Sequence, residues 1–145
     1  MIKELQVELF KHSLPIQIRF NDIDALGHIN NNSYFSFFDL GKTDYFEKIR
    51  GSSISWIEGL IVIARIESDF ISPIYYRETI AVDTKIIKLG EKSGVFLQQI
   101  KNTKTNEVKC RCQSVFVAYN ADTQSSMLIP DVWREVISKY EEIDL

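Results

Sequence analysis

The stretch NDIDALGHINNNSYFSFFDLGKTDYFEKI, residues 21–49, runs from a polar segment directly into a long apolar one. Aromatic, small and aliphatic residues recur in its second part at the helical spacing of three and four: Tyr34, Phe38, Gly41, Tyr45 and Ile49. Phe35, Phe37 and Phe46 widen this stripe beyond the apolar face of a surface helix. We therefore predict a helix that begins near Asn31 and is largely enveloped by other structure, with Gly41 allowing close approach to a sheet.

The segments on both sides of this helix have strand patterns. Residues 15–21 alternate, with Ile16, Ile18 and Phe20 on one face, which predicts a strand with one buried face. Four further strands are expected at 60–72, 79–89, 94–102 and 108–120, the last three forming an antiparallel meander through the turns GEKSG and NTKTNE. Residues 50–59 are expected to form a turn-rich connection, and Pro130 and Asp131 to start a terminal helix. This order predicts an α+β fold with one long central helix laid across an antiparallel sheet of five strands. Exposed edge strands of such a sheet invite pairing between subunits.

Length and composition limit the number of domains and the possible classes of protein. The 145 residues, 45% of them hydrophobic, suit a single domain over residues 1–145 with its own core. A net charge of −3 argues against a nucleic-acid surface. The first twenty residues contain no uninterrupted hydrophobic run, so neither a signal peptide nor a membrane span is expected. Cys110 and Cys112 stand two apart on one strand, and we expect free packing thiols in a cytoplasmic protein.

The polar stretch NDIDALGHINNN, residues 21–32, allows three interpretations. In the first it is a type I turn from Asp24 to Gly27, followed by an asparagine that caps the helix. In the second it binds a cation through Asp22, Asp24 and His28. A calcium loop is disfavoured because Leu26 and Ser33 stand where ligands are needed, and a transition-metal site lacks a second strong nitrogen or sulfur ligand. We expect no metal and no cofactor.

The third interpretation is catalytic. The first amides of a buried helix have no partner within the helix, so they form a site for the negative charge that develops on an ester or thioester oxygen. A carboxylate a few residues earlier could attack the same carbonyl or activate water against it. Asp24 lies seven residues before Asn31, and the loop can fold back to bring both together.

The run D-x-D-x-x-G-H-I-N-N-x-x-Y from Asp22 to Tyr34, followed by an apolar helix, resembles the 4-hydroxybenzoyl-CoA thioesterase family of hotdog-fold enzymes. The resemblance extends through DFISPIYYRETIAV to the proline before the last helix. It implies that Asp24 is the catalytic carboxylate, as nucleophile or general base, and that the Asn31 backbone amide polarises the thioester carbonyl. Tyr34 and Asp39 match positions that hold the helix and line the site.

His28 departs from the enzyme that names the family, where the position is apolar. Plant acyl-carrier-protein thioesterases carry a similar D-x-x-x-H-x-N-N run with a catalytic histidine, but they have an asparagine where this chain has Leu26. A catalytic role and a role as a loop hydrogen-bonder are both open for His28.

The family places coenzyme A between subunits, with its phosphates on cations at the hairpin that matches GEKSG. Only Lys92 matches there, with Lys88 nearby and Glu91 opposing. The resemblance implies an acyl-CoA thioesterase that needs no cofactor and assembles as a homodimer or homotetramer. Two alternatives stay open: an acyl-carrier-protein thioesterase, and a non-hydrolytic module that only binds acyl thioesters. The many apolar side chains near the helix and SSISWIEG favour an apolar acyl group.

Overall fold

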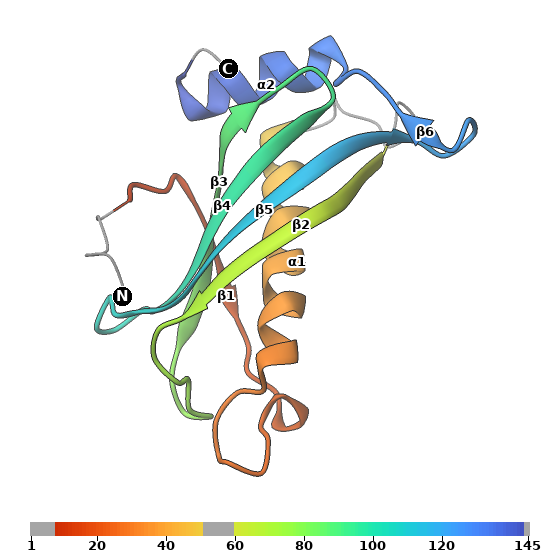
Figure 1. The fold of residues 1–145 in the computed structure, drawn as a ribbon. Helices are drawn as coiled ribbons and strands as arrows, with labels where there is room; N and C mark the ends of the chain where they lie inside the picture. The colour runs from red at the N-terminus through yellow and green to blue at the C-terminus, as the bar shows by residue number, and fades with distance from the viewer. Residues whose placement is uncertain (1–7, 51–59, 144–145) are drawn as a thin grey trace.

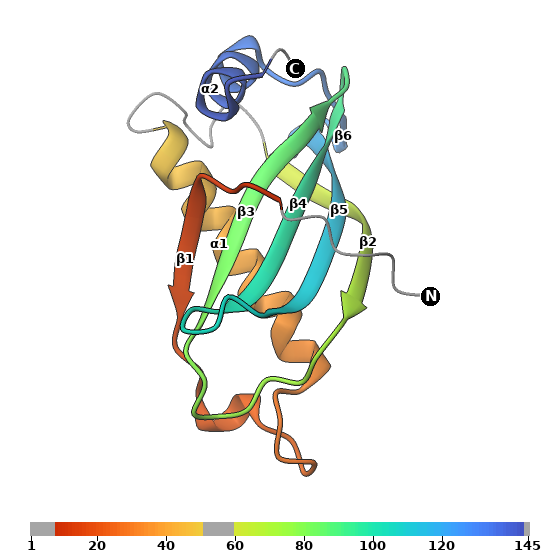
Figure 2. The ribbon, with the colours of Figure 1, turned by 90° about the vertical axis from the view of Figure 1, so that its left-hand side faces the viewer.

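A curved antiparallel sheet and one long helix make up most of the molecule (Figure 1). The computed structural model describes residues 8–50 and 60–143. Five strands follow the order β1 (His12–Ile16), β3 (Ile80–Leu89), β4 (Ser93–Asn102), β5 (Val108–Asn120) and β2 (Leu60–Phe70), and the short β6 (Ser125–Ser126) pairs with β5. Helix α1 (Asn31–Arg50) lies along the inner face of the sheet, and α2 (Asp131–Glu141) covers one end (Figure 2). The predicted α+β arrangement, the meander and both helix starts are confirmed. The predicted connection over 50–59 lies, apart from Arg50, outside the described residues.

The first strand differs from its prediction. β1 ends at Ile16, the residue that pairs with Ile80 at the start of β3, so the chain beyond it has no neighbour to pair with. It continues through a 3-10 turn at Phe20–Asp22, and the Phe20 side chain is 83% exposed. The predicted strand over 15–21 is therefore wrong in its bounds, and the placement of Phe20 on a buried face is wrong. Pro15 is tolerated because β1 lies at the edge of the sheet.

The close contact predicted at Gly41 is confirmed. A Cβ atom there would lie 2.7 Å from Val82 Cγ1 and 2.9 Å from both Gln98 Nε2 and Thr84 Oγ1. Such separations are well inside van der Waals contact, so any side chain at this position would push α1 away from β3 and β4. Gly41 thus sets the distance at which the helix lies on the sheet.

Two apolar clusters lie on either side of this contact. One surrounds the start of α1 and includes Ile29, Tyr34, Phe37 and Phe38. The other lies under α2 and is rich in aromatic rings: Tyr45, Phe46 and Phe96 meet edge to face, and Phe116 and Trp133 belong to the same cluster. Cys110 and Cys112 are free and buried on β5, as predicted.

The helix is less enveloped than predicted. Phe37 and Phe46 are buried, but Phe35 is more than one-third exposed. α1 packs mainly on β3 and β1, which leaves the inner face of β2 open, with Ile66 46% and Phe70 43% exposed. The expectation failed because the apolar stripe of α1 is wider than the part of the sheet that one chain places beneath it.

Candidate active site

Asp22 anchors the polar loop. Its side chain is buried, and its carboxylate accepts hydrogen bonds from the Arg19 backbone amide at 2.8 Å and from the Arg19 guanidinium at 3.1 Å. Burial alone would raise the pKa of Asp22, but hydrogen bonds from Arg19 and Ser33 outweigh it and hold the pKa below its ordinary value. The Asp22 carbonyl also accepts the Asn30 amide at 2.8 Å. This residue therefore ties the start of the loop to its end.

The loop folds back on itself between Asp22 and Asn30. Ile23 and Ile29 form a bridge, and the Asp24 amide donates to the His28 carbonyl at 3.1 Å. At the tip, the Gly27 amide donates to the Asp24 carbonyl and the Leu26 amide donates to Asp24 Oδ1 at 2.9 Å. Gly27 has a φ of 83°, which favours glycine. The predicted turn from Asp24 to Gly27 is confirmed, and it holds Asp24 beside His28.

The start of α1 has one free amide. Asn30 caps the helix, because its Oδ1 accepts the Asn32 amide at 2.9 Å and its carbonyl accepts the Ser33 amide at 2.9 Å. Among the residues that the structure describes, no acceptor binds the Asn31 amide. Asn31 lines a cavity of about 170 Å³, together with His28, Tyr34 and the segment Phe70–Pro73. A free donor at a helix start beside a cavity is the arrangement expected of an oxyanion site.

A second segment of the chain forms the opposite wall of this cavity. The Ile29 amide donates to the Ile74 carbonyl at 2.8 Å, and the His28 ring meets the Tyr75 ring edge to face. The buried Tyr34 ring meets Phe70 edge to face at 5.1 Å, and burial raises the pKa of Tyr34 to about 12. Tyr34 is therefore a neutral packing residue that lines the cavity.

This wall is fixed by an ion pair that sequence reasoning missed. The buried Lys109 on β5 lies 2.8 Å from Glu78 and donates to the Pro73 carbonyl at 3.3 Å. Glu78 in turn accepts the Tyr75 amide at 2.7 Å. No local pattern indicates a pair that is separated by so much of the chain.

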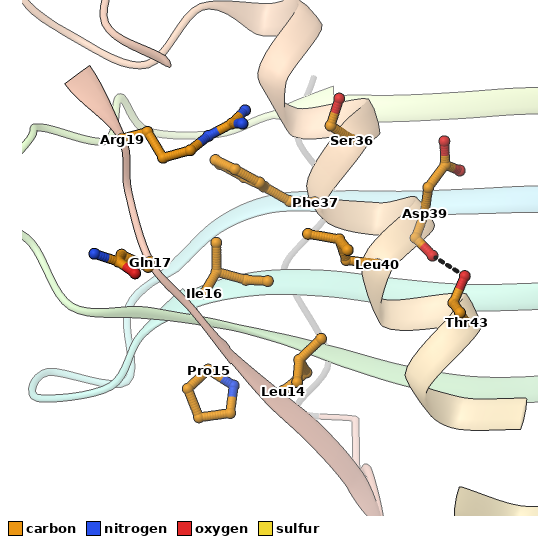
Figure 3. A pocket seen from close by; sticks show the side chains of 10 residues that line it. All are labelled: Leu14, Pro15, Ile16, Gln17, Arg19, Ser36, Phe37, Asp39, Leu40 and Thr43. Carbon is orange, nitrogen blue, oxygen red and sulfur yellow. Dashed lines mark hydrogen bonds between the residues drawn. The ribbon is translucent and has the colours of Figure 1, made fainter. Parts of the chain in front are cut away.

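The other predicted site residues lie outside this cavity. The Asp24 side chain is half-buried and is not among the residues that line it. Asp39 lies on α1 and borders a separate cavity of about 560 Å³ between β1 and α1. Figure 3 shows its carboxylate directed away from Leu14 and Pro15 of β1.

The two predicted coenzyme A lysines lie at the far end of the molecule. Both are exposed, Lys88 on β3 and Lys92 in the hairpin after it, and the Lys92 carbonyl accepts the Ala118 amide. That hairpin contacts the segment that leads into α2, whereas the loop lies at the opposite end of α1 (Figure 1). One chain therefore does not bring these lysines to the loop at residues 22–30.

The cation interpretation gains no support from the arrangement. Asp22 is occupied by Arg19 and Ser33, and one Asp24 oxygen by the turn. Within residues 8–50 and 60–143, no group of three or more histidine, cysteine or acidic side chains could hold a metal ion. No helix in the same ranges is long and apolar enough to cross a membrane.

The sequence pattern of the thioesterase-like superfamily matches residues 18–137, which include the loop, α1 and the whole meander. The chain belongs to this superfamily. A thioesterase from Thermus thermophilus, solved with coenzyme A and zinc, superposes with a TM-score of 0.83 at 28% identity, over 96% of this chain and 100% of that one.

Two further thioesterases are similar to this chain. The long-chain acyl-CoA thioesterase FadM of Escherichia coli K12 is 22% identical over 127 residues, which are 86% of this chain and 95% of FadM. A 4-hydroxybenzoyl-CoA thioesterase variant in complex with 4-hydroxybenzoyl-CoA superposes with a TM-score of 0.78 at 18% identity, over 88% of this chain and 98% of that one. The hotdog fold and the assignment to thioester hydrolases are therefore confirmed.

Proposed function

We propose that this protein is an acyl-CoA thioesterase in which Asp24 and the Asn31 backbone amide act on one thioester carbonyl. The observation that carries the proposal is the Asn31 amide, which begins α1 without an acceptor among the described residues and lines a cavity beside His28 and Tyr34. The names and ligands of the relatives support coenzyme A, rather than a carrier protein, as the thiol carrier. The retained Asp24 favours hydrolysis over binding alone.

The carbonyl oxygen of the thioester accepts the Asn31 amide, and the helix dipole stabilises the oxyanion that forms there. Asp24 then has two possible routes. As a nucleophile, its carboxylate attacks the carbonyl carbon, the C–S bond breaks, and water hydrolyses the resulting anhydride. As a general base, it takes a proton from a water molecule that attacks the same carbon, and the departing thiolate is protonated. Either route needs Asp24 Oδ1 to leave the Leu26 amide or Oδ2 to face the carbonyl.

No metal or cofactor takes part in the proposed reaction, and coenzyme A enters as part of the substrate. Lys88 and Lys92 then serve a site on a neighbouring protomer, because the β3–β4 hairpin that carries them and the loop lie at opposite ends of α1 (Figure 1). β2 is an unpaired edge of the sheet with exposed apolar residues, namely Leu60, Val62, Ile66 and Phe70, which supports a homodimer or homotetramer. Light scattering of the purified protein measures the mass, and a monomer at micromolar concentration would contradict this assembly.

The test is release of free thiol from acyl-CoA and from the same acyl groups on acyl-carrier protein. We expect turnover of acyl-CoA without added metal and unchanged by a chelator. Faster turnover of the carrier-protein thioester would instead favour an acyl-carrier-protein thioesterase. Binding of both without thiol release would contradict hydrolysis and leave a binding module.

A further inference from the structure

A lysine is buried midway along the inner face of the sheet, between the two apolar clusters. Lys42 on α1 is only 5% exposed, and its ammonium lies 5.9 Å above the centre of the Phe96 ring. Lysine is rarely buried to this degree without a close anionic partner, because removing an ammonium from water is costly. The only acceptor recorded for it among the described residues is Asp39 Oδ1 at 3.4 Å.

Asp39 is a poor partner for this charge. Strong ammonium–carboxylate hydrogen bonds are about 2.7–2.9 Å long, and the Asp39 side chain is 72% exposed, so water competes for it. The Asp39 carboxylate is directed away from β1 (Figure 3). Lys42 therefore keeps capacity for a second anion.

Beside the Phe96 ring, the sheet also carries polar side chains. Thr84, Gln98, Cys112 and Ser68 are consecutive partners across β3, β4, β5 and β2, so they form one row across the inner face of the sheet. Gln98 donates through its Nε2 to the Phe38 carbonyl and to Thr84, but its buried Oε1 has no partner within residues 8–50 and 60–143. The Ser114 hydroxyl, one row further along β5, is also buried and has no partner in the same ranges. A buried polar atom without a partner is uncommon in a native protein.

Buried side chains of α1 connect the candidate active site with Lys42. Tyr34, Phe38 and Lys42 follow one another at intervals of four residues and so lie on one stripe of α1. The span from Tyr34 to Lys42 is about 12 Å along the helix. Phe70, whose ring meets Tyr34, and Ile66 are half-exposed on the inner face of β2 beside this stripe. An acyl group whose carbonyl lies at the Asn31 amide would have to extend between this stripe and β2 to reach Lys42.

We propose that Lys42 binds a carboxylate at the distal end of the acyl group, so that the preferred substrates are the CoA thioesters of dicarboxylic acids. This proposal rests on the proposed function and names its substrate class. The carboxylate would supply the close anionic partner that Asp39 does not, and it could accept hydrogen bonds from the Ser114 and Ser68 hydroxyls. An alkyl end at the same place would leave the ammonium without an acceptor, which is unfavourable.

The test compares adipoyl-CoA with hexanoyl-CoA and suberyl-CoA with octanoyl-CoA, pairs that differ only at the distal carbon. The parent protein is expected to show a kcat/KM at least about tenfold higher for the dicarboxylic member of one pair. Lys42→Met should reverse this preference, with the ratio changing by on the order of a hundredfold. Lys42→Arg should keep the direction of the preference. Lys48→Met, on the exposed side of the same helix, should leave the ratio unchanged.

A parent ratio of one or less in both pairs would overturn the proposal, whether or not Lys42→Met folds, and so would an unchanged ratio in a folded Lys42→Met protein. Equilibrium binding of suberyl-CoA and octanoyl-CoA to the Asp24→Asn protein separates this question from hydrolysis. Tighter binding of suberyl-CoA that is lost with Lys42→Met supports the Lys42 site even if the parent releases no thiol. Equal binding of the two contradicts it even if the parent hydrolyses both.

Discussion

The two ends of α1 are built in different ways. At its start, the loop from Asp22 to Asn30 is held by backbone hydrogen bonds and one buried carboxylate, and a donor is left free beside a cavity. At its end, aromatic rings pack edge to face under α2, and Trp133 and Ile137 are almost fully buried. Directional hydrogen bonds can position a reactive group, whereas dense apolar packing stabilises the fold. Substitutions at the two ends should therefore separate turnover from stability.

The largest effect is expected for Asp24→Asn at the loop end. The amide keeps the oxygen that accepts the Leu26 amide, so the turn should persist while the nucleophile or base is lost. We expect kcat to fall by roughly a hundredfold to ten-thousandfold, with substrate affinity largely retained. Thiol release under saturating substrate measures this. Asp122→Asn, in the exposed turn after β5, is the control, and activity of Asp24→Asn within a few-fold of the parent would defeat the catalytic role of Asp24.

Trp133→Ala at the α2 end should act on stability instead. Deleting a buried tryptophan costs about 3–5 kcal/mol of unfolding free energy, because the aromatic cluster cannot close around the space. Turnover per folded molecule should stay within about twofold of the parent at low temperature, since α2, which carries Trp133, and the loop lie at opposite ends of α1 (Figure 1). Denaturant unfolding measures the loss of stability, and thiol release measures turnover.

The control is the neighbouring Val132→Ala, on the exposed side of α2, which should change stability by less than about 1 kcal/mol. A large loss of turnover in folded Trp133→Ala would remove the distinction between the two ends.

The same contrast explains which parts of the fold were predictable from the sequence. Helix α1, the hairpin at GEKSG and the start of α2 follow from local spacing and turn chemistry, and all lie where predicted. The end of β1 could not be predicted from local pattern. It depends on where the pairing with β3 ends and on the hydrogen bond from the Arg19 amide to the Asp22 carboxylate. The alternation of apolar and polar residues continues past Ile16 to Phe20, and for that reason it predicted a longer strand.

The candidate site was predictable only in part, for the same reason. The turn at Asp24 and the helix start at Asn31 are local, and the sequence placed both. The burial of Lys42 and the pairing of Lys109 with Glu78 are set by strands that are distant in the sequence. Lysine side chains are mostly exposed to solvent, so the sequence alone did not indicate that Lys42 and Lys109 are buried.

Asp22→Asn should show how far the loop end depends on one carboxylate. The change removes charge-assisted hydrogen bonds from a buried site and should cost about 1–3 kcal/mol of unfolding free energy. Because the folded pKa of Asp22 lies below its ordinary value of 3.8, the stability it supplies is complete above that value and is lost as the pH falls through the folded pKa. Unfolding measured from pH 7 down to pH 2 should therefore show a shallower acid loss in Asp22→Asn than in the parent. If the unfolding free energies of the two proteins fell in parallel as the pH decreased, ionised Asp22 would not stabilise the fold.

The smallest effect is expected for His28→Ala, although His28 lines the cavity. The bond that holds the loop comes from the His28 carbonyl, which the substitution keeps, and Nδ1 lies 3.5 Å from the Ile29 carbonyl, too far for a strong hydrogen bond. We expect kcat/KM to fall by less than about tenfold, mostly through the lost contact with Tyr75. Tyr75→Ala, which removes the same contact from the other side, should then give a similar loss. A collapse in His28→Ala that matches Asp24→Asn, with Tyr75→Ala unaffected, would instead make the imidazole a catalytic partner of Asp24, as in the plant acyl-carrier-protein thioesterases that share the histidine.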